Sequence, residues 1–183
     1  MDIQSLMNKI DEQREDLISL HQELVKIPSV NTGFMPTGNE TAVCNYVKDW
    51  LKKHGIKSEI LARDPDRGNI IASIEGKSNT NGLLFMSHTD VVPVEDIDKW
   101  EYEPFSAKRA NGRIYGRGSS DCKGLLACQL FAMKIIKESG IELNDNLVLA
   151  SGADEEHGGR YGFGWLVENH LDKISSPYAV NEG

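Results

Sequence analysis

Imidazole and carboxylate side chains flank three apolar segments of this chain. They are His88 and Asp90 after the first segment, Asp121 before the second, and Glu155 with Glu156 after the third. Carboxylates that meet without a cation raise one another's pKa and are driven to protonate. A divalent metal ion removes this repulsion, and imidazole together with carboxylate suits zinc. The pattern therefore favours a metal site, and two metal ions roughly 3.5 to 4 Å apart are the arrangement that hydrolases use to activate water.

The first segment, residues 83–90, predicts a strand that is buried on both faces and belongs to a parallel sheet covered by helices. The two-residue period of a strand would place His88 and Asp90 on the same face, at the carboxyl end where open α/β sheets bind ligands. A nearby carboxylate orients an imidazole toward a metal ion or a proton. The alternative is a core histidine whose ring caps the sheet.

Asp121 has two interpretations. An aspartate directly before a helix is a favoured N-cap, worth on the order of 1 kcal/mol, and its other oxygen remains available to a metal site. The nearby Gly116 and Gly118 lack both the third glycine of a dinucleotide-binding loop and the GK[ST] of a P-loop. We therefore expect no nucleotide site, and expect the two glycines to form a tight turn that directs Asp121 inward.

Glu155 and Glu156 are adjacent, so on a regular strand they would point to opposite faces. The following Gly158 and Gly159 predict that the strand ends in a turn, which lets both carboxylates converge. One would then bind a metal ion, and the other would act on the water that the metal holds. The alternative is a solvated acidic loop.

Periodicity of the apolar residues predicts the elements that must position these side chains. The predicted helices cover residues 3–28, 43–55 and 123–139 and the region of 165–167, and the predicted strands cover 58–62, 69–74, 83–90, 113–115, 146–150 and 178–180. The strands 58–62 and 69–74 are expected to be antiparallel. The helix 123–139 is apolar on most of its circumference, so we expect it to be largely buried.

Composition excludes several classes of protein. The 183 residues fit one domain or a piece of a larger one, and the net charge of −8 with scattered lysines and arginines gives no footprint for nucleic acid or anionic membrane. A polar N-terminus and the lack of an apolar run near 20 residues predict a cytoplasmic protein. The three cysteines match no zinc or redox spacing and are expected to be small buried groups.

Three motifs, in this order and at these distances, resemble the family of dinuclear zinc hydrolases that includes aminoacylase, acetylornithine deacetylase, succinyl-diaminopimelate desuccinylase and the glutamate carboxypeptidases. The motifs are His88-Thr89-Asp90, Gly116-Arg117-Gly118 with Asp121 and Lys123-Gly124, and Glu155-Glu156 with Gly158-Gly159. The segment with Trp100, Pro104-Phe105 and Tyr115 is also typical of the family, so the resemblance covers the chain from about Leu83 onward.

The resemblance implies a role for each candidate residue. His88 and Glu182 would bind one metal ion, Asp121 would bridge both ions, Glu156 would bind the second, Asp90 would orient His88, and Glu155 would be the general base. Zinc is the expected metal, with cobalt or manganese as alternatives. Without the resemblance, Glu182 would be taken for a terminal surface glutamate. Cys122 and Glu103 depart from the family's usual residues, and neither is expected to touch the chemistry.

The fold that the resemblance implies is α/β, a three-layer α/β/α sandwich with a mixed, mainly parallel sheet. Residues 1–183 would be the N-terminal part of the catalytic domain, without the lid or dimerisation domain and without the C-terminal part, so the isolated chain is expected to be incomplete for catalysis. The implied activity is hydrolysis of amide or peptide bonds in N-acyl amino acids or small peptides, with a homodimer as the full-length form. The alternative is a truncated, non-catalytic relative that binds a metal or a partner.

Overall fold

A computed structural model describes residues 2–35 and 37–182. Within them, five strands form one sheet in the spatial order β1-β2-β6-β3-β7. The strands are β1 (Lys57–Ala62), β2 (Gly68–Ile74), β3 (Asn81–His88), β6 (Asn146–Gly152) and β7 (Tyr178–Val180). The β1-β2 and β2-β6 pairs are antiparallel, whereas β3 runs parallel to both β6 and β7. The predicted mixed sheet is confirmed, but it is evenly mixed rather than mainly parallel.

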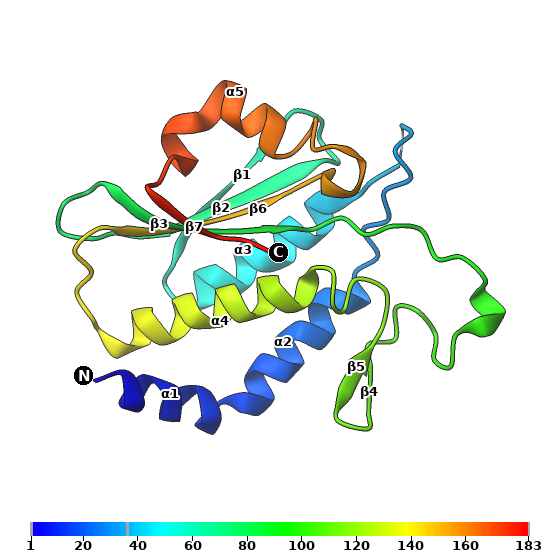
Figure 1. The fold of residues 1–183 in the computed structure, drawn as a ribbon, viewed down its shortest axis with the longest axis horizontal. Helices are drawn as coiled ribbons and strands as arrows, with labels where there is room; N and C mark the ends of the chain where they lie inside the picture. The colour runs from blue at the N-terminus through cyan, green and yellow to red at the C-terminus, as the bar shows by residue number, and fades with distance from the viewer. Residues whose placement is uncertain (1, 36, 183) are drawn as a thin grey trace.

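Helices cover both faces of the sheet, which confirms the three-layer arrangement (Figure 1). They are α1 (Ile3–Glu12), α2 (Arg14–Lys26), α3 (Glu40–Lys53), α4 (Lys123–Ser139) and α5 (Phe163–Ile174). The alternating side chains of β6 show why helices are needed on both faces of the sheet. Leu147 and Leu149 pack toward α3 and α4, while Val148 and Ala150 pack toward Leu166 of α5. Because successive strand residues face opposite sides, an apolar run is buried only when both sides are covered.

Strand β6 is deeply buried, and every residue from Leu147 to Gly152 is buried. The prediction that 83–90 is buried on both faces is only partly right. In β3, Leu84, Ser87 and His88 are buried and the other residues are half-buried. The reason is its neighbour β7, a three-residue strand whose side chains are exposed.

The predicted helix 3–28 is two helices, α1 and α2, separated at Gln13. Both pack against α4, and Lys134 of α4 donates a hydrogen bond to the Gln13 side chain. The continuous periodic pattern does not show this break, which lies where the Lys134 side chain meets Gln13.

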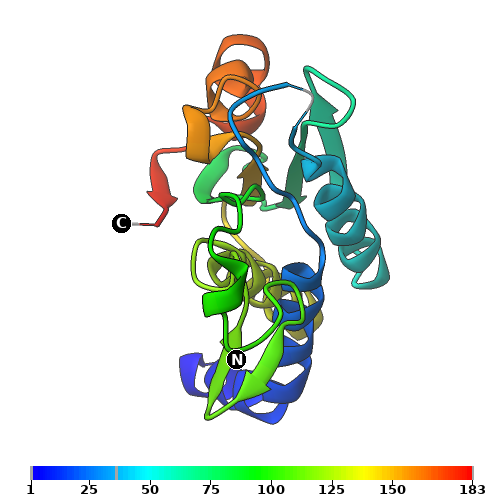
Figure 2. The same ribbon diagram turned by 90° about the vertical axis from the view of Figure 1, so that its right-hand side faces the viewer.

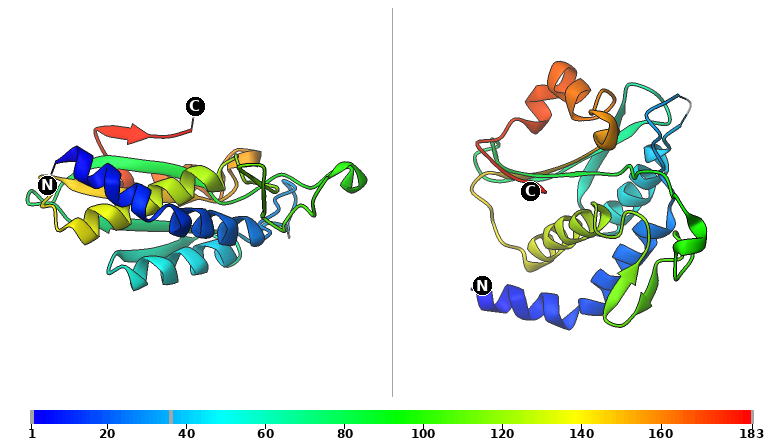
Figure 3. Two further views of the ribbon diagram at one scale, coloured as in Figure 1. Left: turned by 90° about the horizontal axis from the view of Figure 1, so that it is seen from below. Right: turned by 45° about the vertical axis from the view of Figure 1, so that its right-hand side comes forward.

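Between β3 and α4 the chain extends away from the sheet (Figure 3). This segment contains a 3-10 turn, η1 (Ile97–Lys99), and an antiparallel hairpin of β4 (Lys108–Ala110) and β5 (Arg113–Tyr115), which confirms the predicted strand 113–115. Across the described ranges, the helices are all too short or too polar to cross a lipid bilayer.

Candidate metal centre

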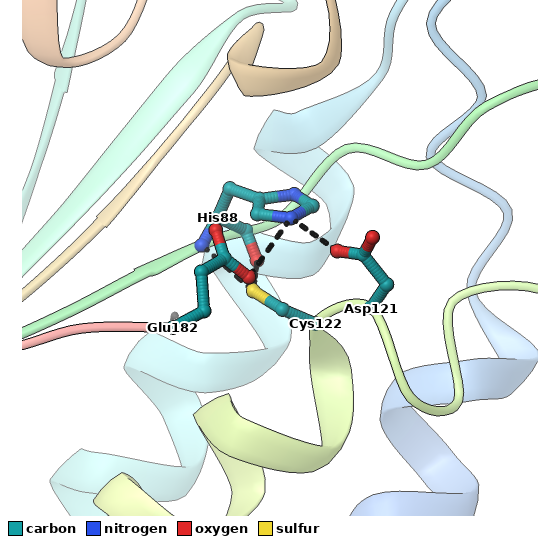
Figure 4. A group of neighbouring side chains, drawn as sticks. All are labelled: His88, Asp121, Cys122 and Glu182. Atoms are coloured by element: carbon teal, nitrogen blue, oxygen red, sulfur yellow. Dashed lines mark hydrogen bonds and ion pairs between the residues drawn. The ribbon is translucent and has the colours of Figure 1, made fainter.

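His88, the last residue of β3, is the point on which the predicted site residues converge (Figure 4). Its ring is buried, with 1% of the side chain exposed, and Nε2 lies 2.9 Å from Asp121 Oδ1. The same nitrogen is 3.6 Å from Glu182 Oε2 and 3.8 Å from Glu155 Oε2. Three segments far apart in the sequence thus bring carboxylates to one imidazole nitrogen.

The other ring nitrogen of His88 has its own partner. Nδ1 lies 3.0 Å from the backbone carbonyl oxygen of Asp90 and 3.4 Å from its Oδ1. Since an oxygen of either kind accepts a hydrogen bond, Nδ1 carries a proton, and without a metal ion Nε2 carries one as well, facing Asp121. A metal ion would take the place of the Nε2 proton and leave the proton on Nδ1. This is the tautomer that a histidine metal ligand requires.

Asp121 faces His88 and does not cap the helix that follows. The N-cap position of α4 is Cys122, and no side chain makes a cap hydrogen bond there among the described residues. The Asp121 side chain is 72% exposed and contacts His88. The predicted turn is confirmed at Gly118, where φ is +78° and an added Cβ would lie 2.4 Å from the Val91 side chain. Only glycine fits this turn, which delivers Asp121 to the site.

Glu155 and Glu156 begin the 3-10 turn η2 (Glu155–His157), which follows β6. The strand has ended at Gly152, so the opposite-facing geometry of a strand does not apply. Their backbone amides donate to the two oxygens of the Asp90 carboxylate, at 3.0 Å to Oδ1 and 3.2 Å to Oδ2. The turn is therefore anchored in the interior, unlike a solvated acidic loop.

The Asp90 carboxylate is completely buried. Burial opposes its ionisation, but hydrogen bonds from His88 and from Asn31 outweigh burial and lower the pKa of Asp90. Strand periodicity was expected to position Asp90, but β3 ends at His88 and so does not include it. Backbone bonds position it instead: Thr89 N–H donates to the carbonyl of Gly152, and Val91 N–H donates to the carbonyl of Ser29.

The electrostatics of the centre call for positive charge. Burial by itself would lower the pKa of His88, but hydrogen bonds with Asp90 and Cys122 and the charge of Asp90 raise it to about 12. Burial also raises the pKa of Glu155, reinforced by the charges of Glu182, Asp90 and Asp121 and opposed by His88. Carboxylates in such surroundings are stabilised by a cation. A divalent ion fits this donor set of imidazole and carboxylates.

Four side chains have ligand atoms within 4.8 Å of one another and could hold such an ion: His88, Asp121, Cys122 and Glu182. Three of them are predicted ligands. The fourth predicted ligand, Glu156, lies outside this group, although burial and the charge of Asp121 raise its pKa. The structure thus brings together the residues expected around one metal ion and leaves Glu156 beside them.

Cys122 was expected not to touch the chemistry, and the structure places its thiol against the backbone of His88. The His88 backbone N–H donates to Cys122 Sγ at 3.1 Å, and the thiol faces the His88 carbonyl at 3.4 Å. The cause is the start of α4, which places residue 122 directly beneath the end of β3. Burial raises the pKa of the Cys122 thiol, so the sulfur is neutral and acts as a hydrogen-bonding neighbour of His88.

Asn31 is a buried contact of the site that sequence reasoning missed. Its Nδ2 donates to Asp90 Oδ2 at 2.9 Å. In the sequence it stands with Thr32 and Gly33 in a run typical of a surface turn. No local pattern distinguishes an asparagine that turns the chain from one that enters a site.

Comparison with known proteins agrees with this geometry. The model of Peptidase family M20/M25/M40 matches residues 84–182. The chain is 34% identical over 158 residues to N-formyl-4-amino-5-aminomethyl-2-methylpyrimidine deformylase of Bacillus subtilis, covering 85% of this chain and 36% of that protein. It is 37% identical over 160 residues to succinyl-diaminopimelate desuccinylase of Blochmanniella floridana, covering 86% of this chain and 40% of that protein.

A solved structure of the same family also resembles this chain. The crystal structure of an M20 family metallo-carboxypeptidase from Sulfolobus solfataricus superposes with a TM-score of 0.78 at 31% identity, covering 91% of this chain and 37% of that one. The chain thus spans about two fifths of the length of the relatives that it matches. The matched region contains every predicted metal ligand, and the chain belongs to Peptidase family M20/M25/M40.

Proposed function

We propose that this chain is the N-terminal part of the catalytic domain of a metal-dependent hydrolase that cleaves amide or peptide bonds in N-acyl amino acids or small peptides. The observation that carries the proposal is the convergence of Asp121, Glu155 and Glu182 on Nε2 of the buried His88. The relatives support it, since their names describe removal of a formyl group, removal of a succinyl group and carboxypeptidase activity.

In this proposal His88 and Glu182 would hold one divalent ion, Glu156 would hold a second, and Asp121 would be a ligand to both. Zinc is the first candidate, with cobalt or manganese as alternatives. When bound, such ions supply positive charge that acidifies water and polarises the substrate carbonyl. Asp90 keeps the proton on His88 Nδ1 and so keeps Nε2 free for its ligand role.

Glu155 is the general base of the proposed reaction. Its carboxylate is 49% exposed and 3.8 Å from His88 Nε2, so it lies at the centre while remaining open to a substrate. A pKa raised by burial and by neighbouring carboxylates brings a glutamate closer to the working pH, where it can accept a proton and return it to the leaving amine. Cleavage of an amide needs both transfers, because the amine leaves only after protonation.

The centre is open to solvent at Asp121 and Glu155, whose side chains are 72% and 49% exposed. We infer that groups outside residues 1–183 complete and cover it. For this reason the activity of the 183-residue chain alone is expected to be low, even when it binds metal. The full-length protein is therefore the form to assay.

The test combines metal analysis with activity. The full-length protein, loaded with zinc, is assayed against a panel of N-acyl amino acids and dipeptides, and its metal content is measured before and after exhaustive chelation. We expect hydrolysis of at least one panel member, loss of activity with the metal, and recovery on adding a divalent ion. Undiminished turnover in protein shown to be metal-free would exclude the proposed mechanism. Full metal occupancy without hydrolysis of any panel member would favour the non-catalytic alternative.

A further inference from the structure

The loop between α2 and α3 crosses the carboxyl end of the sheet, as Figure 2 shows in blue, and inserts Asn31 between two buried carboxylates. Asn31 Nδ2 donates to Asp90 Oδ2 at 2.9 Å and to Asp154 Oδ1 at 3.0 Å, and its Oδ1 accepts the backbone N–H of Gly33 at 2.9 Å. Carboxylates only accept and a backbone N–H only donates, so these partners fix the orientation of the amide. Asn31 is thus a bridge between two negative groups.

Both bridged carboxylates hold the turn η2. Asp90 accepts the backbone amides of its first two residues. Asp154 directly precedes the turn with φ of +62°, and its Oδ2 accepts the backbone N–H of Arg160 at 2.9 Å. The turn is therefore anchored by one carboxylate beneath it and one at its base, and Asn31 joins the two.

The position of Asn31 is itself fixed by the backbone. Its N–H donates to the carbonyl of Val91 at 2.9 Å, and the Val91 N–H donates to the carbonyl of Ser29 at 3.0 Å. These bonds form a parallel bridge between Val30 and Val91. The side chain thus enters the gap between the carboxylates from a backbone that is tied to the end of β3.

We propose that Asn31 is a positioning residue for Glu155. By donating one hydrogen bond to Asp90 and one to Asp154, it keeps the turn in the geometry that presents Glu155 to His88. Without it, the two carboxylates lose the donor that they share, and the turn is free to shift. This inference rests on the proposed function, in which Glu155 is the general base.

The main test is a double-mutant cycle in the full-length protein at saturating zinc, with Asn31→Ala and Glu155→Gln alone and together. A displacement near 1 Å at a catalytic group costs up to about 100-fold, so we expect Asn31→Ala to lower kcat by about 10- to 100-fold and to leave KM within about twofold. In the Glu155→Gln background we expect less than about a threefold further loss, because a positioning residue cannot act through an absent base.

Asn146→Ala is the matched control. Asn146 begins β6, at the end opposite the site, and its side chain likewise accepts a backbone glycine N–H, that of Gly76 at 2.8 Å. The substitution removes a similar hydrogen bond from the same residue type. We expect its kcat to stay within about twofold of the unchanged protein.

A second readout needs neither metal nor substrate. Amide hydrogen exchange of the metal-free protein should become at least about tenfold faster across residues 155–161 in Asn31→Ala, and should be unchanged there in Asn146→Ala. A general loss of stability would instead accelerate exchange throughout the sheet. Should Asn31→Ala fail to fold, Asn31→Ser keeps one donor and permits the same comparisons, with smaller expected effects.

Two results would overturn the inference. One is an equal fold-loss of kcat from the Asn31 substitution with and without Glu155, which would indicate a merely structural role. The other is unchanged exchange across 155–161. If Glu155→Gln by itself leaves kcat intact, the proposed function fails instead, and the exchange data still report whether Asn31 holds the turn.

Discussion

Replacing Arg67 by methionine would remove the cation from a buried charge cluster behind the site. Arg67 is 2% exposed and donates from Nε and Nη2 to the two oxygens of Glu40, each at 2.8 Å. Nη2 also reaches Asp154 Oδ1 at 3.1 Å. Burial disfavours the charged guanidinium, but the hydrogen bonds and charges of these carboxylates outweigh it and raise the pKa of Arg67. Arg67 is therefore charged, and it is the cation that faces both carboxylates.

The magnitude follows from what the substitution leaves behind. Methionine keeps most of the apolar stem and removes every donor, so Glu40 and Asp154 remain buried without a counter-charge. Breaking a buried ion pair by removing one partner costs about 3 to 5 kcal/mol. We expect the free energy of unfolding to fall by about that amount at pH 7.

The penalty should depend on pH. Burial already raises the pKa of Glu40, although Arg67 opposes this rise, and removing Arg67 raises the pKa further. A carboxyl group with a higher pKa in the folded than in the unfolded state takes up a proton on folding. The variant should therefore regain stability relative to the unchanged protein as the pH falls from 7 toward 5.

Urea unfolding of the metal-free protein measures these differences. Arg67→Met combined with Glu40→Gln should recover at least about 1 kcal/mol of the loss, because one uncompensated charge is gone. Lys57→Met is the control, since it breaks a 2.6 Å pair with Glu75 whose side chains are 79% and 61% exposed, and solvent makes such a pair nearly neutral for stability. A loss below about 1 kcal/mol for Arg67→Met at pH 7 would refute the reasoning.

Three further predictions concern the site and its support. Glu155→Gln should leave metal content unchanged and lower kcat by at least the ~10² to 10⁴ of a lost general base. Glu156→Gln should lower metal content itself. Metal loss from the Glu155 variant instead would show that the two roles are reversed. Lys123 donates from Nζ to the Ile27 carbonyl at 2.6 Å, and burial lowers its pKa to about 8. The unfolded state then binds more protons than the folded state between about pH 8 and 10.5. The free energy of unfolding, measured by denaturant titration, should therefore rise across that range by up to about 3 kcal/mol relative to Lys123→Met. The same pH dependence in both proteins would contradict this. At Gly162 an added Cβ would lie 1.9 Å from the carbonyl oxygen of Ala153, so Gly162→Ala should cost about 1 to 3 kcal/mol in thermal unfolding, and an unchanged melting temperature would count against the close approach.

Local sequence determined most of the elements and the chemistry of the site. The helix 123–139 and the strand 178–180 match α4 and β7 to the residue, because apolar spacing and flanking residues act over one or two turns. The motifs around His88, Asp121 and Glu155 indicated a metal centre because imidazole and clustered carboxylates together suit a divalent ion. The convergence of Asp121 and Glu182 on His88 agrees with that prediction.

Tertiary structure decided what local patterns do not encode. The break at Gln13 separates two helices that both pack against α4, and the even mixture of the sheet depends on which neighbour each strand finds. Cys122 contacts His88 only because α4 begins beneath the end of β3. Asn31 lies 59 residues from Asp90 and 123 from Asp154, and it joins them through hydrogen bonds that no sequence period records. Such contacts are set by where loops cross the end of the sheet, and that path is fixed only when the core has formed.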